Sequence, residues 1–125
     1  MKFRYARHTR NLKEVEQFYK EILNFEKLGG FENHNGYDGI FLGKANLNWH
    51  LEFTSSDDSP KQIFDEDDLL VFYPEKKEDY LFILEQIKKK KIPSCEPKNP
   101  YWKENGILIK DPDNFGIIIS KQFAK

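Results

Sequence analysis

Hydrophobic and polar residues alternate along the first half of the chain with two different periods. After Asn11, apolar side chains recur at spacings of three and four residues, which is typical of the buried stripe of an amphipathic helix; they are Leu12, Val15, Phe18, Tyr19, Ile22 and Leu23. Asn11, with Glu14 three residues later, has the pattern of a helix N-cap. Short aromatic or β-branched runs separated by Asn, Gly and Asp predict strands at residues 3–9, 26–31, 39–43 and 49–55.

The second half follows the same order of elements. A strand at 69–73 and a helix at 78–90 precede three further strand candidates, at 94–97, 107–110 and 116–120, with "NPYWKENG" predicted as a loop. The order strand, helix, three strands thus occurs twice, which favours an α+β protein built from a duplicated unit. We expect one domain over 1–125, made of modules 1–56 and 67–125 joined by the polar linker 57–66.

The charge balance excludes several classes of partner. The 20 Lys and Arg residues and 21 Asp and Glu residues give a formal net charge of −1, so no general attraction to nucleic acid or an anionic membrane is expected. No apolar run approaches the roughly 20 residues that cross a bilayer.

The single cysteine, Cys95, excludes an internal disulfide. We therefore expect a cytoplasmic protein.

The stretch "NWHLEFTSS", residues 48–56, contains the candidate chemistry. In a strand, His50 and Glu52 lie on one face, while Leu51 and Phe53 lie on the other. A histidine and a carboxylate on one face are compatible with metal ligation, with a polar pocket wall or with an ion pair. The residues alone leave these three alternatives open.

Three motifs resemble the vicinal oxygen chelate superfamily, which includes glyoxalase I, bleomycin-resistance proteins, fosfomycin-resistance enzymes and extradiol dioxygenases. They are the helix "NLKEVEQFYKEILNF", the strand "HLEFT" and the turn and strand "KDPDNFGIIIS". "FENHNGYDGIFLG" and "NPYW" further resemble an uncharacterised YycE-type branch. The resemblance implies the glyoxalase/bleomycin-resistance fold: α+β, with two βαβββ modules whose curved mixed sheets surround one cavity.

The resemblance also implies where a divalent metal would bind in the enzymes of the superfamily. The matching inward positions are Arg4, Glu52, Asp68 and Ile118. Arginine and isoleucine offer no lone pair to a metal, so we expect no metal and no other cofactor. Instead we expect Arg4 to pair with Glu52, with Asp68 as a second partner. The alternative is a Zn, Ni, Mn or Fe ion held by His8, His50 and Glu52.

These expectations lead to a hypothesis about function. The chain binds a small, partly aromatic molecule in its cavity, using Arg4, His50 and Glu52 together with Tyr101 and Trp102 near the cavity mouth. Glu52 is also the candidate catalytic residue, because a carboxylate can act as a general base. The alternative is a metal-dependent lyase, isomerase or transferase of glyoxalase type. If the chain is an enzyme, we expect either a glyoxalase-type lyase or isomerase, or a resistance enzyme that modifies a small molecule. We also expect a homodimer.

Overall fold

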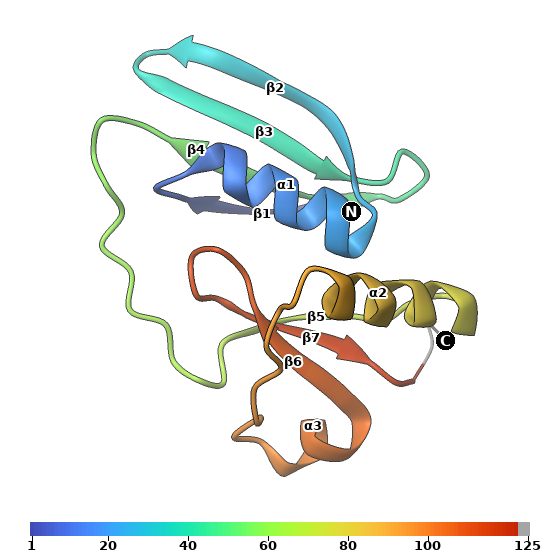
Figure 1. Ribbon diagram of the computed structural model, residues 1–125. Helices are drawn as coiled ribbons and strands as arrows, with labels where there is room; N and C mark the ends of the chain where they lie inside the picture. Colours follow the sequence, from blue (N-terminus) through green and yellow to red (C-terminus); the bar gives the residue numbers. More distant parts are fainter. Residues whose placement is uncertain (123–125) are drawn as a thin grey trace. The chain divides into compact units, whose positions relative to one another are not determined.

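The first half of the chain folds as one sheet covered by one helix. The computed structural model describes residues 1–122 of the protein, and its first sheet has the strand order β1-β4-β3-β2. β1 runs parallel to β4, and the other neighbours are antiparallel. The elements, shown in Figure 1, are β1 (Phe3–His8), α1 (Leu12–Leu23), β2 (Glu26–His34), β3 (Tyr37–Gly43) and β4 (Trp49–Ser55).

Both ends of α1 are fixed by asparagines. The Asn11 side-chain oxygen accepts a hydrogen bond from the Glu14 backbone N–H at 3.1 Å, so the predicted N-cap is confirmed. Asn24 adopts a left-handed conformation with φ 58°, and its backbone N–H donates to the carbonyl of Tyr19. This left-handed residue turns the chain out of the helix and into β2.

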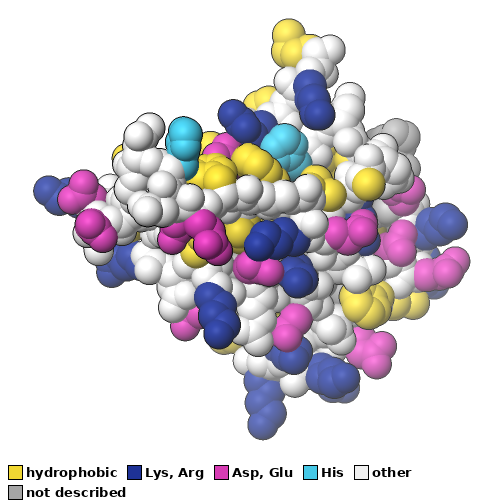
Figure 2. Space-filling model, turned by 90° about the horizontal axis from the view of Figure 1, so that it is seen from above, with side chains coloured by type: hydrophobic (Ala, Val, Ile, Leu, Met, Phe, Trp, Pro, Cys, Tyr) yellow, Lys and Arg dark blue, Asp and Glu magenta, His cyan; other side chains and the backbone are white. Residues whose placement is uncertain are grey.

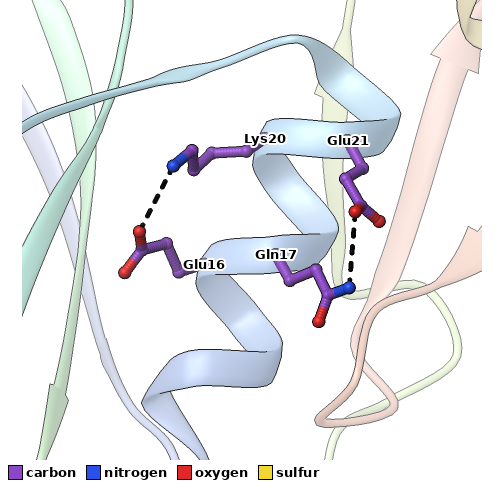
Figure 3. Close-up of polar contacts among 4 residues, drawn as sticks. All are labelled: Glu16, Gln17, Lys20 and Glu21. Carbon is purple, nitrogen blue, oxygen red and sulfur yellow. Dashed lines mark hydrogen bonds and ion pairs between the residues drawn. The ribbon is translucent and has the colours of Figure 1, made fainter.

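The polar side of α1 carries short contacts between residues four apart. Lys20 Nζ lies 3.5 Å from Glu16 Oε2, and Gln17 Nε2 donates to Glu21 Oε1 at 3.3 Å (Figure 3). The opposite side of the helix supplies the buried stripe predicted from the sequence; its buried members are Val15, Phe18, Tyr19, Ile22 and Leu23. The stripe therefore determines which face of the sheet α1 covers.

The second half forms a smaller sheet with the order β5-β7-β6. β5 runs parallel to β7, and β6 runs antiparallel to it. The elements are β5 (Leu69–Phe72), α2 (Lys77–Lys89), α3 (Pro100–Asn105), β6 (Gly106–Lys110) and β7 (Gly116–Ser120). By contact density the chain divides between Gln62 and Ile63, which lies inside segment 57–66.

Two predictions for the second half were wrong. Residues 94–97 form only an isolated bridge between Cys95 and Leu108, because Pro93 and Pro97, two residues before and two after Cys95, have no N–H for a ladder. The predicted loop "NPYWKENG" contains the short helix α3. Asn99 caps this helix by accepting from the Tyr101 N–H at 3.0 Å, and Pro100 occupies its first turn.

The mixed α+β class and the fold predicted from the motifs are confirmed by these sheets and by the related structures given below. Within residues 1–122, no helix has the length and apolar character that crossing a membrane requires.

Candidate ligand-binding face on the first sheet

Strand alternation divides the first sheet into a covered face and an open face. The ring of Phe53 packs 5.1 Å from that of Tyr19 on α1, and the Arg7 guanidinium lies 5.0 Å from the Phe53 ring on the same side. His50 and Glu52 therefore point away from α1, as predicted. We define the open face by the side chains that share this orientation in register: Arg4, Phe31, Phe41, His50 and Glu52.

Arg4 and Glu52 form the predicted ion pair on this face. Arg4 Nε lies 3.1 Å from Glu52 Oε1, somewhat longer than the roughly 2.7–2.9 Å of a tight charge-assisted hydrogen bond. The Glu52 side chain is 12% exposed, whereas that of Arg4 is 53% exposed. Water therefore reaches the guanidinium, and the pair is not buried away from solvent.

Aromatic rings continue from the ion pair across the sheet. The Arg4 Cζ atom lies 5.9 Å from the centroid of the Phe41 ring. The Phe41 ring meets His50 edge-on at 5.4 Å and lies 6.1 Å from Phe31. All three rings are partly exposed. We call Phe31, Phe41 and His50 the aromatic strip.

Each ring of the strip stands beside a glycine of the neighbouring strand. The register pairs are Phe31 with Gly39, Phe41 with Gly29, and His50 with Gly43. A Cβ atom on Gly39 would collide with the Phe31 ring, and one on Gly29 would lie 3.3 Å from Phe41. The glycines thus let the rings lie close to the backbone of the neighbouring strand.

His8 is engaged at both ring nitrogens. Nδ1 lies 2.9 Å from Thr54 Oγ1, and Nε2 lies 3.0 Å from the Asp58 carbonyl oxygen and 3.1 Å from Ser56 Oγ. A carbonyl only accepts, so Nε2 carries the hydrogen and the Thr54 hydroxyl donates to Nδ1 in the neutral ring. His8 therefore fastens the segment after β4 to β1.

This hydrogen bonding determines what His8 can do chemically. Nε2 is a donor, so His8 cannot take a proton from Ser56 and act as its general base. Neither ring nitrogen offers a free lone pair to a metal. Within residues 1–122, the structure contains no group of three or more His, Cys, Asp or Glu side chains that could hold an ion. The set His8, His50 and Glu52 is thus not brought together as a metal site.

The remaining superfamily metal positions carry no suitable ligand set. Asp68 is exposed, and its Oδ2 accepts from the Asp65 N–H at 3.1 Å. Ile118 is fully buried in an apolar cluster with Trp102 and Leu108. With an arginine at the first position, Glu52 is the one carboxylate of the four positions on the open face, and it is paired. These residues do not fit a divalent metal.

Tyr101 and Trp102 do not occupy a loop, so that part of the prediction is corrected. Both belong to α3, and Trp102 is 9% exposed because it packs on Leu108 and Ile118. Tyr101 is exposed, and its hydroxyl donates to Gln122 Oε1 at 3.3 Å. Trp102 is thus a core residue of its own unit.

A groove of about 740 Å³ lies beside edge strand β2, next to the beginning of α1. It contacts Phe31 but none of Arg4, His50 and Glu52. Its charges are mixed in sign, since Lys13, Lys27, Glu16, Glu32 and Asp38 all line it. We therefore place the candidate chemistry on the open face and not in this groove.

The sequence analysis did not select Phe31 or its glycine neighbours. The signal was present as the alternation Gly29-x-Phe31 and Gly39-x-Phe41-x-Gly43. The pairing of each ring with a glycine could be recognised only from the register between neighbouring strands. Figure 2 shows a face on which histidine side chains lie beside hydrophobic ones, with basic and acidic side chains next to them.

Solved structures share this architecture. A YycE protein of unknown function from Bacillus subtilis, whose description relates it to glyoxalases and fosfomycin resistance proteins, matches with a TM-score of 0.88 and 35% identity, over 99% of this chain and 91% of that chain. The trypanothione-dependent glyoxalase I of Leishmania major matches with a TM-score of 0.71 and 18% identity, over 94% and 83% of the two chains. The fold is thus that of the vicinal oxygen chelate superfamily, to which glyoxalases and bleomycin-resistance proteins belong.

Sequence comparison identifies the branch. The models of the YycE-like N-terminal and C-terminal domains match residues 3–54 and 67–121. The uncharacterized protein YycE of Bacillus subtilis (strain 168) is 38% identical over 116 residues, 92% of this chain and 84% of the relative. The chain belongs to the YycE-like family, as the motifs predicted.

Proposed function

We propose that the protein binds a small, partly aromatic molecule on the open face of the first sheet without a catalytic metal. The observation that carries the proposal is the aromatic strip, partly exposed and adjoining the Arg4–Glu52 pair. Planar rings pack favourably edge-to-face or offset against other rings. A sheet face that combines such rings with a few polar groups has the composition of a ligand site.

The donor chemistry supports binding without a metal. Arg4 places a fixed positive charge beside Glu52, where the superfamily's enzymes hold an ion, and a neighbouring cation opposes metal binding electrostatically. A guanidinium can orient an oxygen-bearing ligand through its N–H groups but cannot act as a redox or Lewis-acid centre. The proposal is therefore a binding function and assigns no reaction.

Naphthalene-2-carboxamide, a neutral ring compound, tests the proposal in a titration followed by backbone amide NMR in buffer containing a metal chelator. We expect shifts confined to β2, β3 and β4 around the strip. Phe41→Leu should weaken binding by about tenfold, because a ring–ring contact and some apolar area are lost.

The matched control is Phe82→Leu, which makes the same change at an exposed position of α2 and should leave the titration unchanged. Two outcomes would overturn the proposal. In one, the amide shifts lie elsewhere or Phe41→Leu has no effect. In the other, the compound binds only after zinc, nickel, manganese or iron is added, which would favour the metal-dependent alternative.

A further inference from the structure

We infer that the ligand carries a single carboxylate close to its aromatic ring, and that Arg4 and His50 bind this carboxylate. The inference rests on the proposed function and adds a chemical class to it. Four features of the open face support it: the donors that Arg4 has left, the place of His50, the spacing of charge and ring, and the charge of Glu52.

Arg4 has donors to spare. Its guanidinium is a planar fork with five N–H groups, and the ion pair with Glu52 uses the one on Nε. Among residues 1–122, the Arg4 side chain makes no other ion pair or hydrogen bond. The two terminal nitrogens form the edge of the fork that binds carboxylates bidentately, and the side chain is half exposed.

His50 is the direct neighbour of Arg4. The two residues are register partners on the parallel strands β1 and β4, so their side chains emerge side by side on the open face. In the described part of the chain, the His50 side chain makes a ring contact with Phe41 but no hydrogen bond. A neutral imidazole always has one N–H to donate, so both residues can donate to one acid group.

The spacing of charge and ring defines the size of the ligand. The Arg4 Cζ atom lies 5.9 Å from the Phe41 centroid, and Phe31 is one ring further along. An acid group bonded to the ring directly, or through a short linker, can reach Arg4 while the ring rests on Phe41. A long flexible linker would carry the ring beyond the strip.

Glu52 selects among anions. Its charge cancels that of Arg4, so the pair can accept one further negative charge through directed hydrogen bonds, but a dianion would be repelled by the adjacent carboxylate. This favours a carboxylate over a phosphate monoester, which carries close to two charges at neutral pH.

The test compares two probes of nearly equal shape, naphthalene-2-carboxylate and naphthalene-2-carboxamide, by calorimetry or NMR. We expect the wild-type protein to prefer the carboxylate by roughly fivefold to tenfold, since a hydrogen bond to a charged group at a half-exposed site is worth that much. The preference should shrink when the salt concentration is raised to about 1 M, because exposed charges are then screened.

Three charge variants separate the inference from a merely structural effect. Arg4→Gln should abolish the preference, whereas Glu52→Gln should increase it, because the opposing charge is removed. Arg10→Gln makes the same substitution outside the open face and should leave the preference unchanged. Opposite shifts from the two partners of one ion pair are not expected if the pair only stabilises the fold.

Each result then has one meaning. Equal binding of both probes by the wild type, or a preference that survives in Arg4→Gln, would overturn the inference while the proposed function stands. Failure of the neutral carboxamide to bind the open face would overturn the proposed function itself. Stronger binding of 2-naphthyl phosphate than of the carboxylate would contradict the role assigned to Glu52.

Discussion

Arg4 and Glu52 are an unequal pair in their exposure to water. A carboxylate that is 12% exposed costs free energy to desolvate, and its partner must compensate for it. Arg4 does so from a half-exposed position, where solvent screens the attraction and can replace it if the arginine is removed. The pair is therefore better suited to presenting donors to a ligand than to holding the fold together.

Arg4→Ala should accordingly cost about 1 kcal/mol or less in the free energy of unfolding, measured by urea denaturation. A dry site would instead lose about 3–5 kcal/mol, because Glu52 would keep an uncompensated buried charge. Lys20→Ala, which removes the exposed helix pair with Glu16, is a control of similar expected size. A loss of 3 kcal/mol or more in the free energy of unfolding for Arg4→Ala would contradict the solvent-exposed arrangement of the ion pair.

At the residue scale, the sequence predicted which side chains form the ion pair and share a sheet face, but not how exposed they are or which rings lie beside them. Alternation was enough to place His50 and Glu52 on one face, and a family position was enough to select Arg4 as the partner. The exposure of the guanidinium and the ring–glycine pairs depend on cross-strand register. Register is set by contacts between distant residues and is not encoded in a local pattern.

Among the elements, α1 depends most visibly on its caps. The side chain of Asn11 satisfies one of the backbone N–H groups that a helix leaves unpaired at its start. Asn11→Ala should destabilise the protein by about 1 kcal/mol in thermal or urea unfolding. Asn11→Asp keeps an acceptor at the same place and should be close to neutral; equal losses for the two variants would argue against the cap.

In the second unit, α3 takes the place of the predicted loop. The Trp102 ring of α3 packs against Leu108 and Ile118 and covers the sheet face that carries them. Gly106 permits this closure, since a Cβ there would lie 2.8 Å from Ile118 and 3.0 Å from Trp102. The second unit thus fills with its own side chains the kind of surface that the first unit leaves open.

Trp102→Ala should therefore cost about 3–5 kcal/mol of stability, through lost burial and the cavity left behind. Tyr101→Ala, which removes the adjacent exposed ring, should cost less than about 1 kcal/mol. Chemical denaturation of both variants compares them directly. If Tyr101→Ala proved the more damaging, the placement of the two rings would have to be exchanged.

The long periodic elements were predictable because their signals are local. The 3.6-residue stripe of α1 and the apolar run of β7 extend over enough positions to outweigh single departures. Residues 94–97 and α3 were mispredicted because both segments are short, and in short segments Pro and Asn residues decide the local structure. Asn99-Pro100 was the start signal that the sequence analysis missed.

For the whole molecule, the fold limits the choice of chemistry without fixing it, since one fold hosts many activities. The sequence and the exposed apolar side chains also bear on whether the protein forms oligomers. The chain has 11 Phe, 6 Tyr and 2 Trp, and Leu81 and Phe82 on α2 are 50% and 40% exposed. Large exposed apolar side chains are suited to an isologous contact between copies.

We therefore expect a homodimer in solution. Sedimentation velocity at tens of micromolar should show a species of twice the 14.9 kDa chain mass. Phe82→Glu should shift the equilibrium toward the monomer if α2 contributes to the contact. A single species of 14.9 kDa across the concentration range would show that the protein is a monomer.

The central claim is that the open face of the first sheet binds an organic ligand and no catalytic metal. Native mass spectrometry of the protein purified from its own cells reports metal, ligand and subunit number in one spectrum. We predict an added organic mass that is lost on gentle activation and is less abundant in Phe41→Leu, with no stoichiometric zinc, nickel, manganese or iron. A divalent ion bound at one per chain, and lost in Glu52→Gln, would contradict the claim.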